Sequence, residues 1–187
     1  MKKKELEPKN YLFPMPTVLV GATVDGKPNF LTVAYCGIVN ITPPTISVAL
    51  NKAHYTNQGV RANGTFSVNI PSAAMAEATD YCGLHSGNQV DKSRVFEVFY
   101  GKLKTAPLIK TAPVNLECKL LHTLFLDPDE LFIGEIVAAY ANDDCLHDDS
   151  LEIKKIDPLI FSTSDKSYYR VGEKLGKAWS IGKNFKP

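Results

Sequence analysis

The feature that most constrains the fold is a series of seven strand-like runs separated by short turns. Several runs alternate apolar residues with others at a period of two, and all are bounded by Gly, Pro, Asp or Asn. Only two short helices are expected, at residues 57–62 and 72–78, the second capped by Ser72. So many strands, with helices only at the margins, predict a mainly β protein with a closed or partly closed antiparallel barrel. The runs are residues 17–23, 29–39, 45–50, 65–70, 114–126, 131–140 and 159–162.

Two turns fix how neighbouring runs connect. Asp25-Gly26 is a strong hairpin signal between the first run and the second. The acidic segment 127–130, Asp127-Pro128-Asp129-Glu130, is expected to turn the long run 114–126 back into the next one. Both turns favour antiparallel neighbours.

Length and charge limit the classes of protein. A chain of 187 residues fits one domain, residues 1–187, which would bury roughly 70% of its unfolded surface. The 21 basic and 20 acidic residues nearly cancel, which argues against nucleic acid as a partner. The apolar runs 18–24 and 131–141 are too short to span a membrane. Residues 5–8, Glu-Leu-Glu-Pro, interrupt the basic N-terminus where a signal peptide needs an apolar segment, so we expect a cytoplasmic protein.

The cysteines and histidines are scattered and predict no metal site. The four cysteines contain no C-x-x-C pair and are expected to be reduced thiols. Cys36 and Cys118 lie in strand-like runs and are expected in the core, whereas Cys145 lies in a polar segment and is the expected exposed thiol. His122 is more simply a barrel-interior or interface histidine than a metal ligand. The acidic segment 143–149 lacks calcium-loop spacing and is interpreted as a solvated turn.

Common cofactor and catalytic motifs are missing from the sequence. No G-x-G-x-x-G, no G-x-x-x-x-G-K-[ST] and no G-x-S-x-G segment occurs, which disfavours Rossmann, P-loop and α/β-hydrolase enzymes. Glu117, Glu135 and Glu152 are interpreted as solvated or hydrogen-bonded strand residues rather than acid or base catalysts. No catalytic residue is predicted.

One segment does indicate chemistry. The alternating run that ends at Leu50 passes through Lys52 to Tyr55 and Thr56, where a helix is expected to start and to end at Gly64. A helix start offers unpaired N–H groups and a partial positive charge, so a phosphate would be stabilised there. An ordinary helix capped by Thr56 is the alternative interpretation.

The order of several short motifs brings a family into view, because each is weak alone but together they span nearly the whole chain. The chain resembles the flavin reductase-like proteins of the FMN-binding split barrel, and most of all the flavoredoxins. The motifs are Phe13-Pro14-Met15-Pro16, Gly26-Lys27-Pro28-Asn29, Thr32-Val33-Ala34-Tyr35-Cys36-Gly37, Pro43-Pro44, Lys52-Ala53-His54-Tyr55-Thr56, Phe66-Ser67-Val68-Asn69-Ile70-Pro71, Ser86-Gly87, Asp91-Lys92, Glu117-Cys118-Lys119-Leu120, Phe132-Ile133-Gly134-Glu135 and Gly176-Lys177-Ala178-Trp179-Ser180-Ile181-Gly182.

The resemblance implies an antiparallel split β-barrel with a few short peripheral helices, FMN as cofactor and no metal. Tyr55 and Thr56 match positions that hold the FMN phosphate, and Lys52 would add a point charge to the donors at the helix start. Asn29 with residues 32–35 matches the strand beside the ribityl chain and ring. Lys92, in a loop that reaches the flavin, would stabilise negative charge on the reduced ring; a surface lysine is the alternative. The implied cofactor-binding residues are Asn29, Thr32, Val33, Ala34, Tyr35, Leu50, Asn51, Lys52, Tyr55, Thr56, Ser86, Asp91, Lys92 and Phe161.

Three functions from different classes remain open. In the first, bound FMN takes a hydride from NADH or NADPH, and in the second it is an electron carrier between redox protein partners. The third, a binding module that has lost flavin, is disfavoured because Asn29, Lys52, Tyr55 and Thr56 are all present.

A homodimer is also expected. In the run 114–126, Leu121 and Phe125 lie on the face opposite Val114, Leu116, Leu120 and Leu124, so one face would fill the barrel and the other would need cover. The tail supplies Tyr169, Val171, Leu175 and Trp179 for that cover across a two-fold axis, completing a pocket between subunits. The alternative is that the tail folds back on its own barrel.

Overall fold

The protein is built on one seven-stranded antiparallel sheet, described by a computed structural model for residues 1–186. The order across the sheet is β3-β2-β6-β9-β10-β5-β4. Its strands are β2 (Val18–Val24), β3 (Lys27–Val33), β4 (Cys36–Asn40), β5 (Thr45–Asn51), β6 (Thr65–Ile70), β9 (Val114–Leu126) and β10 (Asp129–Ala141). The mainly β architecture predicted from the strand density is therefore confirmed.

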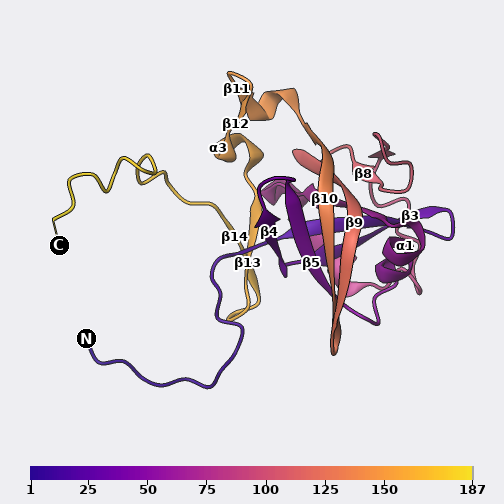
Figure 1. Ribbon diagram of the computed structural model, residues 1–187, viewed down its shortest axis with the longest axis horizontal. Helices are drawn as coiled ribbons and strands as arrows, with labels where there is room; N and C mark the ends of the chain where they lie inside the picture. Colours follow the sequence, from indigo (N-terminus) through magenta and orange to yellow (C-terminus); the bar gives the residue numbers. More distant parts are fainter. Residues whose placement is uncertain (187) are drawn as a thin grey trace.

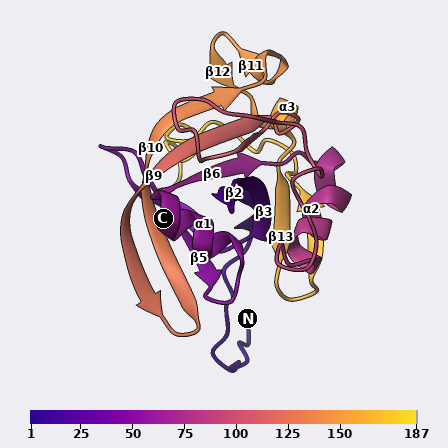
Figure 2. The same cartoon turned by 90° about the vertical axis from the view of Figure 1, so that its right-hand side faces the viewer.

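Smaller elements surround this sheet. A second sheet joins β1 (Met15–Pro16), β13 (Leu159–Ser162) and β14 (Ser167–Arg170) in the order β1-β13-β14. Two short hairpins pair β7 (Val98–Phe99) with β8 (Leu108–Ile109) and β11 (Leu146–His147) with β12 (Ser150–Leu151). The helices are α1 (Thr56–Asn63), α2 (Ala76–Leu84) and α3 (Ile153–Ile156), with 3₁₀ turns η1 (Ala73–Met75) and η2 (Asp143–Cys145). Helix α1 packs on β2 and α2 on β3 (Figure 2).

The predicted turns are present. Asp25 and Gly26 both have positive φ, 49° and 76°, as a two-residue hairpin requires, and Val24 pairs with Lys27 across it. The segment 127–130 turns β9 into β10, with Leu126 opposite Asp129. Gly64 ends α1 with φ 62°, as expected from the sequence.

One secondary-structure prediction is wrong and another is only partly confirmed. The run 29–39 is not one strand, because the chain leaves β3 after Val33 and re-enters the sheet as β4 at Cys36. The segment 72–78 is helical, but as the 3₁₀ turn η1 leading into α2, which continues to Leu84. Ser72 precedes the first helical residue and forms a β-bridge to Pro158, but its side chain makes no cap bond.

The break at Ala34 and Tyr35 has a topological consequence. β3 and β4 are the two edge strands of the sheet, yet only two residues join them, so the edges must lie close together in space. One backbone hydrogen bond, from the Ala49 amide to the Tyr35 carbonyl (2.8 Å), attaches the two-residue link to β5. The sheet is therefore a barrel split along one line, which we call the seam.

The barrel interior holds one apolar core. Residues from β2, β3, β5, β6 and β10, such as Val20, Leu31, Val48, Phe66 and Phe132, are buried together with Val60 of α1. Outside the barrel, both chain ends extend from it on the same side (Figure 1). No helix among residues 1–186 is long and apolar enough to cross a bilayer.

Candidate functional site

A groove follows β3 and reaches the seam through three adjoining hollows. The end hollow, about 270 Å³, lies at Asp25, Asn29 and Asp91. The middle hollow, about 180 Å³, is bounded by Tyr55, Thr56, Ser86 and Lys92 and shares Tyr55, Gly87 and Lys92 with the end hollow. The seam hollow, about 230 Å³, is lined by residues 31–35 and 49–51 and shares Leu31 and His54 with the middle hollow.

The structure brings the sequence-predicted residues to this groove, with one exception. Lys52 lines none of the three hollows. The other predicted residues line the groove: Asn29, Tyr55, Thr56, Ser86, Asp91 and Lys92 in the end and middle hollows, and Thr32, Val33, Ala34, Tyr35, Leu50, Asn51 and Phe161 in the seam hollow.

The start of α1 presents free hydrogen-bond donors to the middle hollow. Tyr55, not Thr56, precedes the first helical residue, and neither makes a side-chain cap bond, so the prediction that Thr56 caps the helix is wrong. The buried Thr56 hydroxyl instead accepts a hydrogen bond from the Asn29 amide (2.8 Å), which leaves its own proton free to donate. The backbone amides of Tyr55 and Thr56 donate no hydrogen bond within residues 1–186.

Lys52 points elsewhere because a carboxylate holds it. Its ammonium pairs with Asp127 in the β9–β10 turn, and both side chains are largely exposed. Asp127 in the acidic turn therefore competes with a phosphate for the Lys52 ammonium, which the sequence predicts to lie at the phosphate. An exposed pair of this kind contributes little stability, so the pairing leaves the ammonium free to exchange partners.

Lys92 is buried, so the surface-lysine alternative is wrong. Its ammonium donates to the carbonyl oxygens of Phe30 (3.0 Å) and Cys82 (2.8 Å), and the residue is 3% exposed. Burial lowers the pKa of this ammonium. Lys92 thereby fixes the loop after α2 to the free edge of β3 and brings a cation to the wall between the end and middle hollows.

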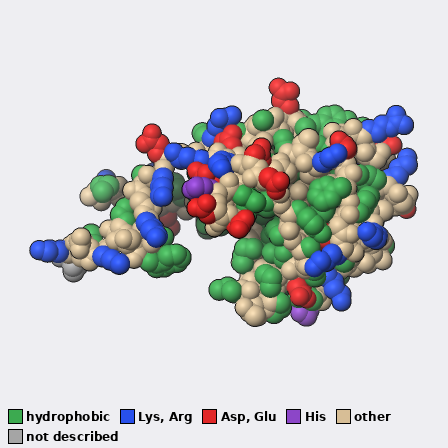
Figure 3. Space-filling view, turned by 90° about the horizontal axis from the view of Figure 1, so that it is seen from above, with side chains coloured by type: hydrophobic (Ala, Val, Ile, Leu, Met, Phe, Trp, Pro, Cys, Tyr) green, Lys and Arg blue, Asp and Glu red, His purple; other side chains and the backbone are tan. Residues whose placement is uncertain are grey.

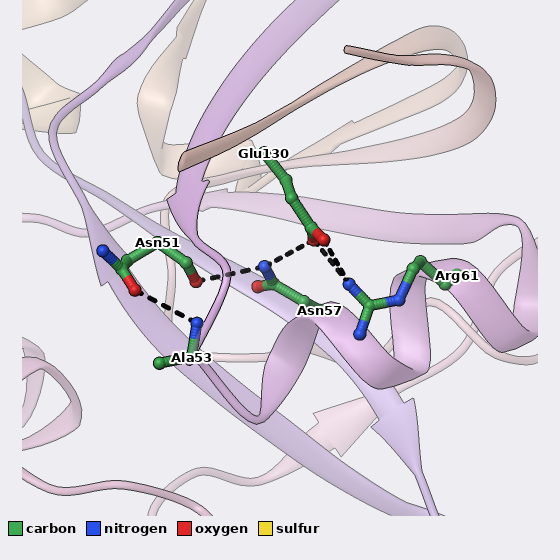
Figure 4. Close-up of polar contacts among 5 residues, drawn as sticks. All are labelled: Asn51, Ala53, Asn57, Arg61 and Glu130. Atoms are coloured by element: carbon green, nitrogen blue, oxygen red, sulfur yellow. Dashed lines mark hydrogen bonds and ion pairs between the residues drawn. The ribbon is translucent and has the colours of Figure 1, made fainter. Parts of the chain in front are cut away.

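A polar network supports the turn between β5 and α1 (Figure 4). The Asn57 amide donates to the Asn51 carbonyl (3.1 Å) and to Glu130 (2.9 Å), and the Arg61 guanidinium donates to both oxygens of Glu130 at 2.7 and 2.5 Å. The Asn51 side chain accepts from the Ala53 amide (3.0 Å). The network joins β5, α1 and β10 and holds the helix start in position.

Sequence reasoning missed several groove residues. His54 lines both the middle and the seam hollow, and burial, aided by the nearby Lys92 charge, lowers the pKa of its imidazole. Asp129 lines the seam hollow, while Gly83 and Leu84 come from the end of α2. His54 lay inside the segment already singled out, whereas α2 carries no signal that it turns toward β3.

Burial tests the predictions for five further residues. Cys145 is buried, not exposed, because η2 packs it against Val114 and Ile156. His122 is exposed, so it does not lie in the barrel interior. Glu117 is buried and hydrogen-bonded, as the sequence interpretation allowed: it accepts from the amides of Lys102 (2.9 Å) and Leu103 (3.0 Å). Cys118 lies in the core, and Cys36 packs against that core partly buried.

Comparison with known proteins decides the family. The model of the flavin reductase like domain matches residues 10–169. The chain belongs to the flavin reductase-like family.

Within this family, the solved structures most like the chain include two flavoredoxins. The flavoredoxin of Methanosarcina acetivorans is 46% identical, with 98% of each chain covered and a TM-score of 0.95. The flavoredoxin of Desulfovibrio vulgaris (Miyazaki F) is 39% identical, covering 97% of this chain and 100% of that one, with a TM-score of 0.90. The FMN reductase (NADH) RutF of Stutzerimonas stutzeri is 27% identical over 119 residues, 63% of this chain and 66% of its own. The fold is the FMN-binding split barrel of this family.

Proposed function

We propose that this protein binds FMN along the groove and transfers electrons through it, taking them from NADH or NADPH. The observation that carries the proposal is the set of free donors at the start of α1, in a groove that continues to an apolar seam. When bound, FMN supplies the acceptor for a hydride and the donor of electrons. The names of the two flavoredoxins and of RutF support both the cofactor and its class of chemistry.

The residues of the groove fit FMN in charge and in shape. Two free backbone amides and the free Thr56 proton would hold the terminal phosphate, with the Lys92 cation nearby. Asn29, whose side chain donates to Thr56, lines the adjoining end hollow. The seam hollow is lined by Leu31, Val33, Ala34 and Leu50, which suit the faces of a flat ring, and by Asn51 and backbone groups, which suit its polar edge.

The acidic end hollow of the groove favours FMN over larger flavins. Asp25 and Asp91 stand at the end hollow, where a second phosphate or a further nucleotide would have to pass. Asp91 has a pKa lowered to about 2 because it accepts hydrogen bonds from Ser93 and is paired with Lys27, so it is anionic at neutral pH. We therefore expect FAD to bind less tightly than FMN.

An electron carrier with protein redox partners is the second candidate. It is favoured by one specific observation, the 46% identity to a flavoredoxin, against 27% to an FMN reductase that uses NADH. Both candidates use the same flavin groove and differ only in the electron donor.

Anaerobic spectroscopy of the FMN-reconstituted protein tests the proposal and separates the candidates. Rapid bleaching of the yellow protein by NADH or NADPH supports the reductase. Bleaching only by dithionite or a reduced redox protein supports the carrier. A protein that stays colourless after incubation with FMN and removal of free flavin contradicts both.

A protein with reduced thiols and this chemistry would work in the cytoplasm, which is the location we propose.

We also propose a homodimer. The turn end of the β9–β10 hairpin exposes apolar side chains on both faces, including Leu121, Leu124 and Phe125. The C-terminal segment stands apart from the body of the protein and carries exposed Leu175 and Trp179 among its lysines (Figure 3). Two such surfaces on one chain would cover each other across a two-fold axis. Light scattering of the FMN-loaded protein at micromolar concentration is the test, and a mass near 20.6 kDa would contradict the dimer.

A further inference from the structure

His54 lies where the middle and seam hollows of the groove meet. It lines both hollows, and the other residue that they share, Leu31, is apolar. Within residues 1–186, His54 is therefore the one side chain at this junction that can carry a charge. A flavin with its phosphate at the start of α1 and its ring at the seam would pass directly along the imidazole.

The turn that carries His54 is attached by its backbone to the sheet. The His54 amide donates to the Asn51 carbonyl (2.9 Å), and the Ala53 amide donates to the Asn51 side chain (3.0 Å; Figure 4). The Lys52 amide donates to the Pro128 carbonyl (3.0 Å), in the turn between β9 and β10. The ends of three strands thus position the imidazole in the groove.

Both ring nitrogens of His54 are available to a ligand. Neither has a hydrogen-bond partner within residues 1–186, and neither is closed to solvent, since the unpartnered side-chain atoms without exposed surface all belong to threonines and to Asn57. One nitrogen of a neutral imidazole accepts a hydrogen bond and the other donates one, whereas both donate in the imidazolium. Protonation therefore changes both the charge and the hydrogen bonds that His54 offers to a molecule in the groove.

Charged groups of opposite sign act on the imidazole. Burial has the largest effect on the pKa of His54 and lowers it, and Lys92 in the wall of the middle hollow lowers it further. Asp129 in the wall of the seam hollow raises the pKa. The sum is a lowered pKa, so His54 is mostly neutral at neutral pH. The other titratable residues that line the two hollows are Tyr35, Tyr55 and His85.

Asp129 is the free carboxylate of the acidic turn between β9 and β10. Asp127 is paired with Lys52, and Glu130 is paired with Arg61. Asp129 has no such partner within residues 1–186, and strand pairing places it opposite Asn51, to which the His54 turn is bonded. It can therefore stabilise an imidazolium from the seam side.

We propose that His54 takes up a proton when negative charge enters the groove, first with the FMN phosphate and then on reduction of the flavin, and that Asp129 is the positioning residue for the imidazolium. This inference rests on the proposed function. Reduction by NADH or NADPH transfers a hydride to the flavin, oxidises the nicotinamide and leaves the flavin one charge more negative. One proton from water, bound at His54, balances that charge.

The pKa of His54 in the unmutated protein is the direct test. Imidazole NMR signals are followed over about pH 5 to 9 in the flavin-free protein, with FMN, and with FMN reduced by dithionite under argon. We expect the pKa to be lowest without flavin and to rise by about one unit or more with reduced FMN, because a nearby negative charge favours the imidazolium. The exposed His122 lines none of the three hollows, so its signals should titrate identically in the three states.

The reduction potential of bound FMN gives a second measurement. His54→Gln keeps a polar side chain that does not titrate. One proton per two electrons changes the equilibrium tenfold per pH unit, so the midpoint potential of the parent should fall about 30 mV per pH unit more steeply than that of His54→Gln where His54 gains its proton. His122→Gln should match the parent. Asp129→Asn should lower the His54 pKa and move this range to lower pH.

Each result decides the inference. An equal His54 pKa in the flavin-free, FMN-loaded and reduced protein would overturn it, and so would equal slopes of potential against pH in the parent and His54→Gln. If His54→Gln fails to bind FMN, the NMR titration of the unmutated protein still decides. Failure of FMN to bind the parent would contradict the proposed function and this inference together, whereas FMN binding with an unchanged His54 pKa would contradict this inference alone.

Discussion

Gly87 lies so close to Asn29 that a Cβ atom added to the glycine would stand 2.1 Å from the Asn29 Oδ1 atom. The same atom would stand 2.8 Å from the ring of Tyr55. Asn29 cannot move aside without losing its bond to Thr56. The loop after α2 thus approaches the groove only because residue 87 has no side chain.

We therefore expect Gly87→Ala to weaken FMN binding by roughly tenfold or more, since it displaces Asn29 and Tyr55 together. A fluorescence titration with FMN measures the change. Gly172→Ala is the matched control, because nothing lies within 4 Å of the position of its added methyl group. Equal dissociation constants for the two variants would show that the close approach has no role in flavin binding.

The Arg61–Glu130 pair should stabilise the protein more than an exposed pair does. Glu130 is 7% exposed and accepts from both Arg61 and Asn57, so Arg61→Ala leaves a buried carboxylate short of a partner. We expect a loss of about 1–3 kcal/mol in the free energy of unfolding, measured with urea. Lys110→Ala breaks the exposed Lys110–Glu97 pair and should cost less than about 1 kcal/mol. Similar losses in both variants would mean that the network around α1 adds no more stability than an exposed ion pair.

Thr56, rather than Lys52, should bind the phosphate of FMN. A charge-assisted hydrogen bond contributes about 1.5–3 kcal/mol, so Thr56→Ala should weaken FMN by that amount and riboflavin far less. Thr56→Ser, which keeps the hydroxyl, is the control. Lys52→Ala should have a smaller effect because Lys52 lines none of the three hollows of the groove. If the parent protein binds FMN and riboflavin equally, no phosphate site exists at this helix start.

The free energy of unfolding should decrease at alkaline pH, because burial raises the pKa of thiols in the folded protein. Burial raises the pKa of Cys82 from 9.0 to about 11, so the unfolded chain releases this proton at a lower pH than the folded one. The contribution of Cys82 is therefore complete below pH 9 and is lost as the pH rises through 11. Between about pH 8 and about pH 10.5, the parent protein should lose about 2 kcal/mol more than Cys82→Ala.

Urea unfolding at these two pH values gives the comparison. The lowered pKa of Lys92 acts in the opposite direction, since stability then rises with pH, but it is present in both proteins and largely cancels. Parallel pH dependences of the parent and Cys82→Ala would contradict this assignment.

Periodicity and turn residues were sufficient to predict most of the sheet. β6, β9 and β13 have the predicted bounds, since each run alternates or is strongly apolar and ends at Gly, Pro, Asp or Ser. The break at Ala34 and Tyr35 could not be predicted, because both residues are compatible with a strand and only the closure of the barrel separates β3 from β4.

The groove residues that lie in family motifs could be predicted from the sequence. The residues whose positions depend on tertiary packing could not. Thr56 and Asn29 were named from the resemblance and do meet. The burial of Lys92 and Cys145 depends on α2 and η2 packing against distant strands, which no local pattern reports. The ion pair between Lys52 and Asp127, which directs Lys52 away from the groove, likewise joins residues 75 positions apart.

The seam also determines which part of the protein opens first. β3 and β4 each have a strand partner on one side only, so their outward amides depend on the two-residue link and on whatever lies in the groove. Deuterium should therefore enter these two edges earliest, while β6 and β9 in the middle of the sheet exchange only when the whole domain unfolds. A flavin lying along β3 and the seam would cover the open edge of β3, so bound FMN should slow exchange there while β4, which lines none of the three hollows, exchanges as before.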